Sequence, residues 1–201
     1  MIRGAFLFIC VIALTAAITP PVNYKSLRYD FVAGSTLTID GTSTVHDYSC
    51  SAKTLQGFMT SEADESGKLV KVTDTRVTVA VTNLDCGKSQ MNDNLKKALK
   101  MKANPNITFT LESATLAAGD QNVRTTIKAR GQLSVAGTTK PVDLTVTAVT
   151  RPDGKIELQG AIPLKMTTFD VKPPTMFLGT LKTSDDVKIE FKVIAAPALG
   201  T

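Results

Sequence analysis

The sequence has few of the residues from which metal sites and nucleic-acid interfaces are built. Its 201 residues include no tryptophan, one histidine and three cysteines, and aromatic residues make up 5%. One histidine with so few thiols cannot complete a zinc ligand set, so we expect no metal and no other cofactor. Proteins that bind nucleic acid combine a strong basic patch with interleaved aromatic residues. With a net charge of only +5, this chain is not expected to bind nucleic acid.

The densest group of basic residues is Lys96, Lys97, Lys100 and Lys102. Three of these lysines fall within a predicted helix whose apolar residues occupy the other side, and Lys102 follows it, so a solvated helix face is the favoured interpretation. A weak attraction to anionic lipid head groups is the lesser alternative.

Catalytic motifs are also lacking. His46 is the only histidine, and the neighbouring Asp47 would point to the opposite face of a strand, so the two side chains form no local acid–base pair. No nucleophile elbow marks a catalytic serine, and no glycine-rich phosphate loop occurs. We therefore expect no catalytic residues. His46 is expected to bind backbone at a strand start or to lie at the mouth of a pocket, and an active site built on it is a remote alternative.

The chain contains a single long uncharged run, from Gly4 to Ile18, which follows Arg3 and precedes Pro20-Pro21. A basic start, an apolar middle and a zone of small residues are typical of a secretory signal peptide. At about 15 residues the run is shorter than the ~20 that span a bilayer as a helix. We predict a signal peptide at residues 1–19, export to the periplasm or beyond, and no stable membrane span in the mature chain. An uncleaved N-terminal anchor is the alternative.

Two of the three cysteines lie outside this leader. Cys10 falls within it, which leaves Cys50 and Cys86 in the mature chain. In an oxidising compartment an even pair of cysteines favours a disulfide, so we predict that Cys50 and Cys86 are bonded. Two free buried thiols are the alternative.

The rest of the chain is dominated by alternation of apolar and polar residues, the period of a strand with one face in water. Arg151–Lys155, which contains Pro152-Asp153-Gly154, predicts a tight hairpin, and short links between strands imply antiparallel neighbours. The alternating segments are 77–82, 107–112, 123–135, 142–147, 156–165 and 187–193.

One segment has helical spacing instead. Met91, Leu95, Ala98 and Leu99 recur at the helical period, and Asn104-Pro105 ends the pattern, so a short helix is predicted at about 91–100. About eight strands therefore offer an apolar face, and one helix is available to cover them. The sheet must bury this face on itself, as a closed barrel or as a two-sheet sandwich, and the pattern does not choose between them. A barrel of eight strands can be filled by side chains or can hold one small ligand.

Four segments, in order, carry a resemblance to a known family. They are Leu37–Asp47 followed by Gly57-Phe58; Met91–Lys100 followed by Asn104–Phe109; the hairpin Gly131–Val142; and Phe177–Thr180 leading into Val187–Val193. From about Ser35 to Ala195 the chain resembles the YceI-like family, the lipocalin-like polyisoprenoid-binding proteins of bacteria. In one respect it departs from the family pattern: members often have a second histidine in the first hairpin and an Arg-Asp pair before the helix. Here only His46 is present and the helix begins Gln90-Met91-Asn92-Asp93, so the ligand preference is expected to differ.

The resemblance implies an all-β fold, an extended antiparallel lipocalin-like barrel of about eight strands, at residues 35–196 after a polar segment at 20–34. It also implies an apolar tunnel without catalysis, which holds an isoprenoid or similar long-chain lipid for transport or storage. A structural or interaction module with a packed core and no ligand is the alternative. On the first interpretation, the tunnel is expected to be lined by strand residues Val79, Phe109, Ile127, Leu144 and Phe191, helix residues Met91, Leu95 and Leu99, and loop residues Phe169, Met176 and Phe177.

Overall fold

The structure is a computed structural model, and it describes residues 24–65, 68–117, 124–176 and 181–198. The predicted signal peptide at 1–19 lies outside the described residues. Nearly all of the described chain is antiparallel sheet. The strands are β1 (Lys25–Phe31), β2 (Thr36–Ser43), β3 (Tyr48–Ala52), β4 (Gln56–Ala63), β5 (Leu69–Ala80), β6 (Asn106–Ala117), β7 (Arg124–Val135), β8 (Thr138–Thr150), β9 (Ile156–Lys165), β10 (Thr175–Met176) and β11 (Leu181–Pro197).

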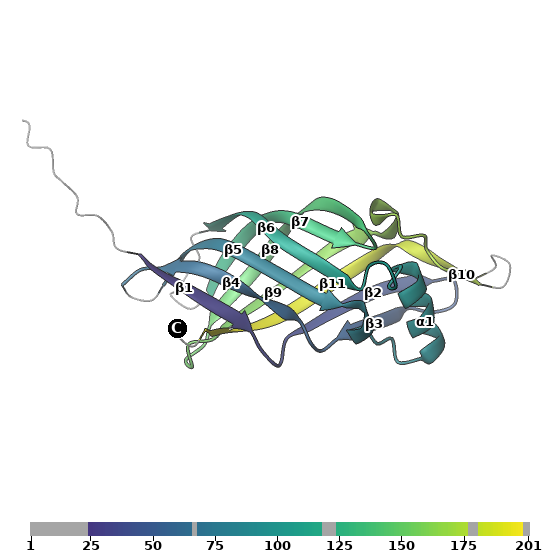
Figure 1. Cartoon of the computed structure of the whole chain (residues 1–201), viewed down its shortest axis with the longest axis horizontal. Helices are drawn as coiled ribbons and strands as arrows, with labels where there is room; N and C mark the ends of the chain where they lie inside the picture. The colour runs from purple at the N-terminus through teal and green to yellow at the C-terminus, as the bar shows by residue number, and fades with distance from the viewer. Residues whose placement is uncertain (1–23, 66–67, 118–123, 177–180, 199–201) are drawn as a thin grey trace, which may run out of the picture.

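The sheet closes on itself as an elongated barrel (Figure 1). Strands β4 to β9 follow one another and β11 comes next, while β1 pairs with both β4 and β11 and so completes a ring of eight strands. The closing register joins Tyr29 to Pro197 and Phe31 to Ala195. The structure therefore confirms the predicted barrel and decides against the two-sheet sandwich.

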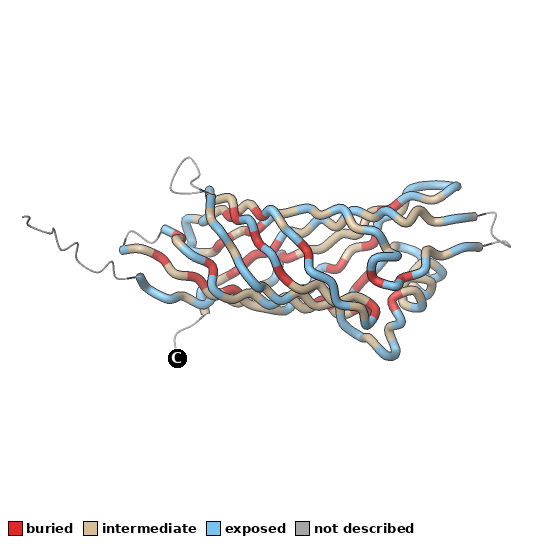
Figure 2. Tube along the Cα trace, turned by 90° about the horizontal axis from the view of Figure 1, so that it is seen from above, coloured by how far each residue is buried: buried red, intermediate tan, exposed pale blue. Residues whose placement is uncertain are grey.

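A second hairpin, β2–β3, extends the barrel wall at the end opposite the last described residues of β11 (Figure 1). Figure 2 shows the same elongated body from above. Strand β2 pairs with β11 from Thr183 to Lys192, and β3 pairs with β2. A pair of backbone hydrogen bonds between Ser51 and Asp85 then connects β3 to the chain that follows β5. Strand β11 thus supports two successive partners, β2 along most of its length and β1 at its end.

Alternation along each strand decides which residues face the interior. In β7, Ile127 and Ala129 are buried while Lys128 and Arg130 are exposed. Arg130 forms an ion pair with Asp143 of β8 on the outer surface, at 3.1 Å. The apolar side chains thus gather inside the ring and the charged ones outside, as the period of two predicts.

The helix α1 (Ser89–Ala98) lies across one end of the barrel (Figure 1). It begins and ends two residues earlier than predicted. The helix ends at Ala98 because Leu99 caps it and Lys100 takes a left-handed conformation with φ of 51°. Two short 3-10 turns also occur, η1 (Val81–Asn83) and η2 (Met166–Phe169). No helix within the described ranges has the length and apolar character that a membrane crossing requires.

The polar segment at 20–34 was expected to lie ahead of the barrel, but it contains β1. Leu27, Tyr29 and Phe31 point inward from this strand, while Arg28 and Asp30 form an ion pair on its outer side at 3.0 Å. The guanidinium of Arg28 also stacks on the ring of Phe58 in β4. The barrel therefore starts at Lys25, and β1 was missed because its inward residues are few and its outward residues are strongly polar.

Candidate ligand-binding cavity

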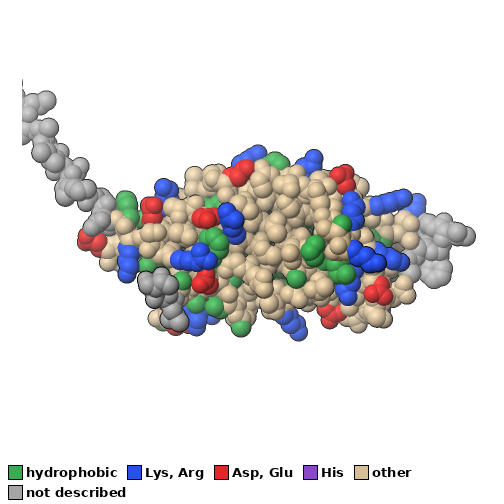
Figure 3. Space-filling view, viewed as in Figure 1, with side chains coloured by type: hydrophobic (Ala, Val, Ile, Leu, Met, Phe, Trp, Pro, Cys, Tyr) green, Lys and Arg blue, Asp and Glu red, His purple; other side chains and the backbone are tan. Residues whose placement is uncertain are grey.

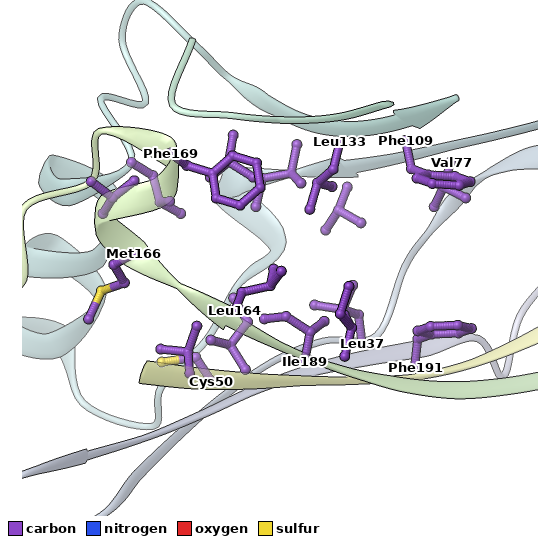
Figure 4. Close-up of a pocket in the computed structure, with 18 of the residues that line it drawn as sticks. Leu37, Cys50, Val77, Phe109, Leu133, Leu164, Met166, Phe169, Ile189 and Phe191 are labelled. Atoms are coloured by element: carbon purple, nitrogen blue, oxygen red, sulfur yellow. The ribbon is translucent and has the colours of Figure 1, made fainter. Parts of the chain in front are cut away.

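The interior of the barrel is hollow. A cavity of about 520 Å³ lies between its walls, within the range of small-molecule sites. Side chains from opposite walls point toward one another across it (Figure 4). On one wall these are Phe169, Leu133, Phe109 and Val77, and on the other Leu164, Ile189, Leu37 and Phe191.

Most of the residues expected to line a tunnel lie on the wall of this cavity. The strands contribute Val79, Phe109, Ile127, Leu144 and Phe191, α1 contributes Met91 and Leu95, Leu99 follows it, and η2 contributes Phe169. Phe177 and the side chain of Met176 lie outside the described part of the chain. The structure thus brings together side chains that are far apart in the sequence.

The middle of the cavity has almost no hydrogen-bonding chemistry. The polar side chains of the wall lie mostly at the α1 end, where they include those of Ser43, Gln90, Asn94 and Thr183. Elsewhere the wall consists of aliphatic and aromatic side chains, with the Thr75 hydroxyl and the Tyr48 phenol as exceptions. Burial raises the pKa of the Tyr48 phenol, so this group stays neutral at physiological pH. A guest in this space would be held by removal of apolar surface from water and selected by its shape.

At the end where the N-terminal strand begins, the barrel is filled. Tyr29, Leu69, Ile156 and Ala195 are buried there and belong to the same apolar cluster as the cavity wall, but they do not line the cavity. Burial also raises the pKa of the Tyr29 phenol. The cavity therefore ends inside the barrel at this end.

At the other end the cavity reaches the surface beside α1. Its wall there includes exposed side chains of His46, Lys88, Lys165 and Lys182. His46 thus lies at the mouth, where its Nδ1 lies 2.9 Å from the Asp47 carbonyl oxygen. Among the described residues that line the cavity, every charged side chain is a lysine and none is a carboxylate.

These rim lysines were not expected from the sequence. Lys88 precedes α1, Lys165 ends β9, and Lys182 lies near the start of β11, so they come from three separate elements. Lys165 forms an ion pair with Asp186 at 2.7 Å, which raises the pKa of its ammonium group. The sequence contained one signal for these lysines: a lysine next to an inward apolar residue at the end of a strand, as Lys165 follows Leu164, is placed near the end of the barrel.

A disulfide joins Cys50 of β3 to Cys86 in the chain leading to α1, with an S–S distance of 2.03 Å, as predicted. Both cysteines lie on the cavity wall, and the bond lies next to the Ser51–Asp85 bridge. The Asn92 side chain accepts a hydrogen bond from the Cys86 N–H at 2.7 Å and donates one to Asp85 at 2.9 Å. The start of α1 is therefore fastened to the rim of the cavity.

Polar contacts also fix the charge of Asp85. The Asn92 side chain and the Gly87 N–H both donate to its carboxylate, and these bonds lower the pKa of Asp85 below its ordinary value. The group is exposed, so it is ionised at neutral pH and serves as an acceptor at the base of the helix. No group of three or more His, Cys, Asp or Glu side chains suited to a metal occurs within the described residues.

Comparison with known proteins gives one family and several similar structures. A family model described as the YceI-like domain matches residues 22–195. BcnA of Burkholderia cenocepacia is 19% identical over 81% of this chain and 96% of its own, with a TM-score of 0.64. A polyisoprenoid binding domain from Saccharophagus degradans is 14% identical over 86% of this chain and 99% of its own, also with a TM-score of 0.64.

The YceI protein of Campylobacter jejuni is 20% identical over 75% of this chain and 85% of its own, with a TM-score of 0.56. At these identities the likeness to the solved structures shows the fold alone. No curated protein matches the sequence.

Proposed function

Since the chain belongs to the family of YceI-like domains, we propose that it binds an isoprenoid or a similar long apolar chain inside the barrel. The observation that carries this proposal is the cavity of about 520 Å³, whose walls are apolar between a filled end and a polar mouth. The similar structure from Saccharophagus degradans is described as a polyisoprenoid binding domain, which supports the same class of ligand.

Burial of apolar surface supplies the affinity in this proposal. Each CH₂ group removed from water contributes about 0.8 kcal/mol before the cost of ordering the chain. Because few polar groups face the middle of the cavity, selection acts on the length and shape of the guest. A guest with a polar end would place that end at the mouth, among the exposed lysines and His46 and in contact with water.

The proposed role is that of a carrier or store, without catalysis. It would act in the periplasm or outside the cell, which the signal-peptide pattern at residues 1–19 and the Cys50–Cys86 disulfide support. A module with a packed core is the weaker alternative, since the interior of this barrel is hollow.

Extraction of the protein from its own host tests the binding directly. Native mass spectrometry followed by organic extraction is expected to find a co-purifying lipid with a long apolar chain. An empty protein that also takes up no prenyl chain when one is supplied would refute the proposal.

A matched pair of variants locates the ligand. Ala114 of β6 lines the cavity, and the next residue, Thr115, is exposed on the outer face. Ala114→Phe is expected to fill the cavity and reduce the bound lipid, while Thr115→Phe adds the same ring outside and leaves the lipid in place. Equal lipid content in the two variants would place the ligand outside the barrel. Fractionation of host cells and N-terminal sequencing of the mature chain test the export.

A further inference from the structure

The end of the molecule at the cavity mouth carries an excess of positive charge. Residues 88–102, which form α1 and its flanks, contain five lysines and one aspartate. Lys and Arg side chains gather at this end of the surface (Figure 3). The lysine ion pairs among the described residues involve Lys71, Lys155, Lys165 and Lys188, and none of the five lysines of this segment.

These lysines are displayed outward by the geometry of the helix. Met91 and Leu95 of α1 line the cavity. At 100° per residue, Lys96 and Lys97 project from the opposite side of the helix. Lys97 is exposed and Lys96 half-buried, and the exposed Lys100 follows after the end of the helix. One side of α1 therefore forms part of the cavity wall, and the other side places lysine ammonium groups on the surface around the mouth.

An exposed apolar side chain lies at the same mouth. Val45, at the tip of the turn between β2 and β3, is 60% exposed and also borders the cavity. Tyr24, the other exposed large apolar residue of the described chain, lies next to β1 at the far end. The Ser43 hydroxyl donates to the His46 carbonyl at 2.8 Å and accepts from the Val45 N–H at 3.3 Å, so the turn holds Val45 outward.

We propose that the α1 end of the barrel docks on an anionic phospholipid surface, with the lysines of residues 88–102 near the phosphates and Val45 inserted among the acyl chains. This rests on the proposed function, because a water-insoluble guest must pass between a membrane and the cavity. The far end is filled, so the mouth is the route of exchange. Lysines around an exposed apolar tip suit a lipid interface, where charge attraction and apolar insertion act together.

The test uses protein purified from its host, stripped of lipid, with vesicles that contain no isoprenoid. Co-sedimentation is expected with mixed phosphatidylcholine and phosphatidylglycerol vesicles and not with phosphatidylcholine alone. Because salt screens exposed charges, binding is expected to fall steeply between low salt and about 1 M salt.

Two triple variants with the same change in net charge separate a docking face from general attraction. Neutralising one lysine near an anionic surface reduces partition by about fivefold, so K96Q/K97Q/K100Q is expected to lose about a hundredfold. K25Q/K68Q/K128Q, on exposed positions elsewhere along the barrel, is expected to bind like the unchanged protein. Val45→Ser is expected to weaken binding by a few fold, about equally at all salt concentrations.

Three results would overturn the docking proposal. They are equal binding to neutral vesicles, equal losses in the two triple variants, and no binding to anionic vesicles while polyglutamate binds through Lys96 and Lys97. The last would identify an acidic polypeptide as the partner. Uptake of a detergent-dispersed prenyl alcohol is measured in parallel: uptake without docking refutes only the docking, and docking without uptake refutes only the proposed function.

Discussion

The ring of Phe191 lies over Gly160, its direct partner on the neighbouring strand β9. A Cβ added at Gly160 would come 2.5 Å from Cζ and 2.9 Å from Cε1 of this ring. On the opposite wall Phe109 covers Gly131 in the same way, and its Cζ would lie 2.5 Å from an added Cβ. Because glycine lets both rings lie against their walls, the space between them stays open (Figure 4).

Gly160→Ala is therefore expected to push the Phe191 ring toward the cavity. Overpacking of this kind lowers the free energy of unfolding by about 1–3 kcal/mol. Binding of an apolar guest should weaken as well, because the cavity becomes narrower. Urea denaturation and ligand titration measure the two effects. Phe191→Leu in the same chain should restore much of both losses, and an unchanged stability of the single variant would contradict the role given to this glycine.

Removal of the disulfide is expected to destabilise the chain. Cys50 and Cys86 are 36 positions apart, and closing a loop of that length stabilises a fold by at most about 4 kcal/mol in the chain-entropy model. The double variant C50A/C86A should lose about 2–4 kcal/mol in denaturant titrations. Reductant should lower the stability of the unchanged protein toward that of the variant. Labelling of both thiols before any reduction would show that the bond does not form.

Acid is expected to loosen the attachment of α1 before the rest of the barrel. The hydrogen bonds that lower the pKa of Asp85 stabilise the fold while this group is ionised. Their contribution is present above the pKa of the unfolded chain and is lost as the pH falls through the lower pKa of the folded state, below about pH 4.

Hydrogen exchange of the α1 amides between pH 7 and pH 2, corrected for intrinsic rates, measures this loosening. Asp85→Asn should remove part of the pH dependence. Other aspartates, such as Asp153 and Asp185, also have a lowered pKa, so the difference between the two proteins isolates Asp85. Identical profiles would show that Asp85 does not anchor the helix.

Ser35→Ala is expected to weaken the junction between β1 and β2. The buried Ser35 hydroxyl donates to the Val32 carbonyl at 2.8 Å and accepts from the Ile194 N–H at 3.0 Å. Alanine would leave this buried N–H without its acceptor, at a cost of about 1–3 kcal/mol in the free energy of unfolding. Ser26→Ala, on the exposed face of β1, is the matched control and should be nearly neutral. Similar values for the two variants would rule out this role of Ser35.

The sequence predicted the elements whose signal is local. Strand β7 alternates Ile127 and Ala129 with Lys128 and Arg130, and α1 places Met91 and Leu95 one turn apart, so each element could be identified from its own period. In a closed sheet every inward side chain faces the interior. The alternation that predicted the strands therefore also predicted most of the residues that line the cavity.

What the sequence did not predict depends on contacts between distant segments. Strand β1 has a short and polar pattern, and its place in the ring rests on pairing with Pro197 and Ala195. The rim lysines converge from three elements that only the fold brings together. Whether the interior is hollow or filled depends on how aromatic side chains lie, as the Phe191 side chain does over Gly160. The alternation of apolar and polar residues does not predict such side-chain positions.

The closing seam between β1 and β11 also determines when this protein can fold. Ser35 and Ile194, which are hydrogen-bonded beside the seam, are 159 positions apart. The ring therefore cannot close until almost the whole chain has been synthesised, and until then the edges of β1 and β9, which β11 will cover, remain free to pair with other chains. We expect slow folding, in milliseconds to seconds, with one late step that brings the two ends of the chain together.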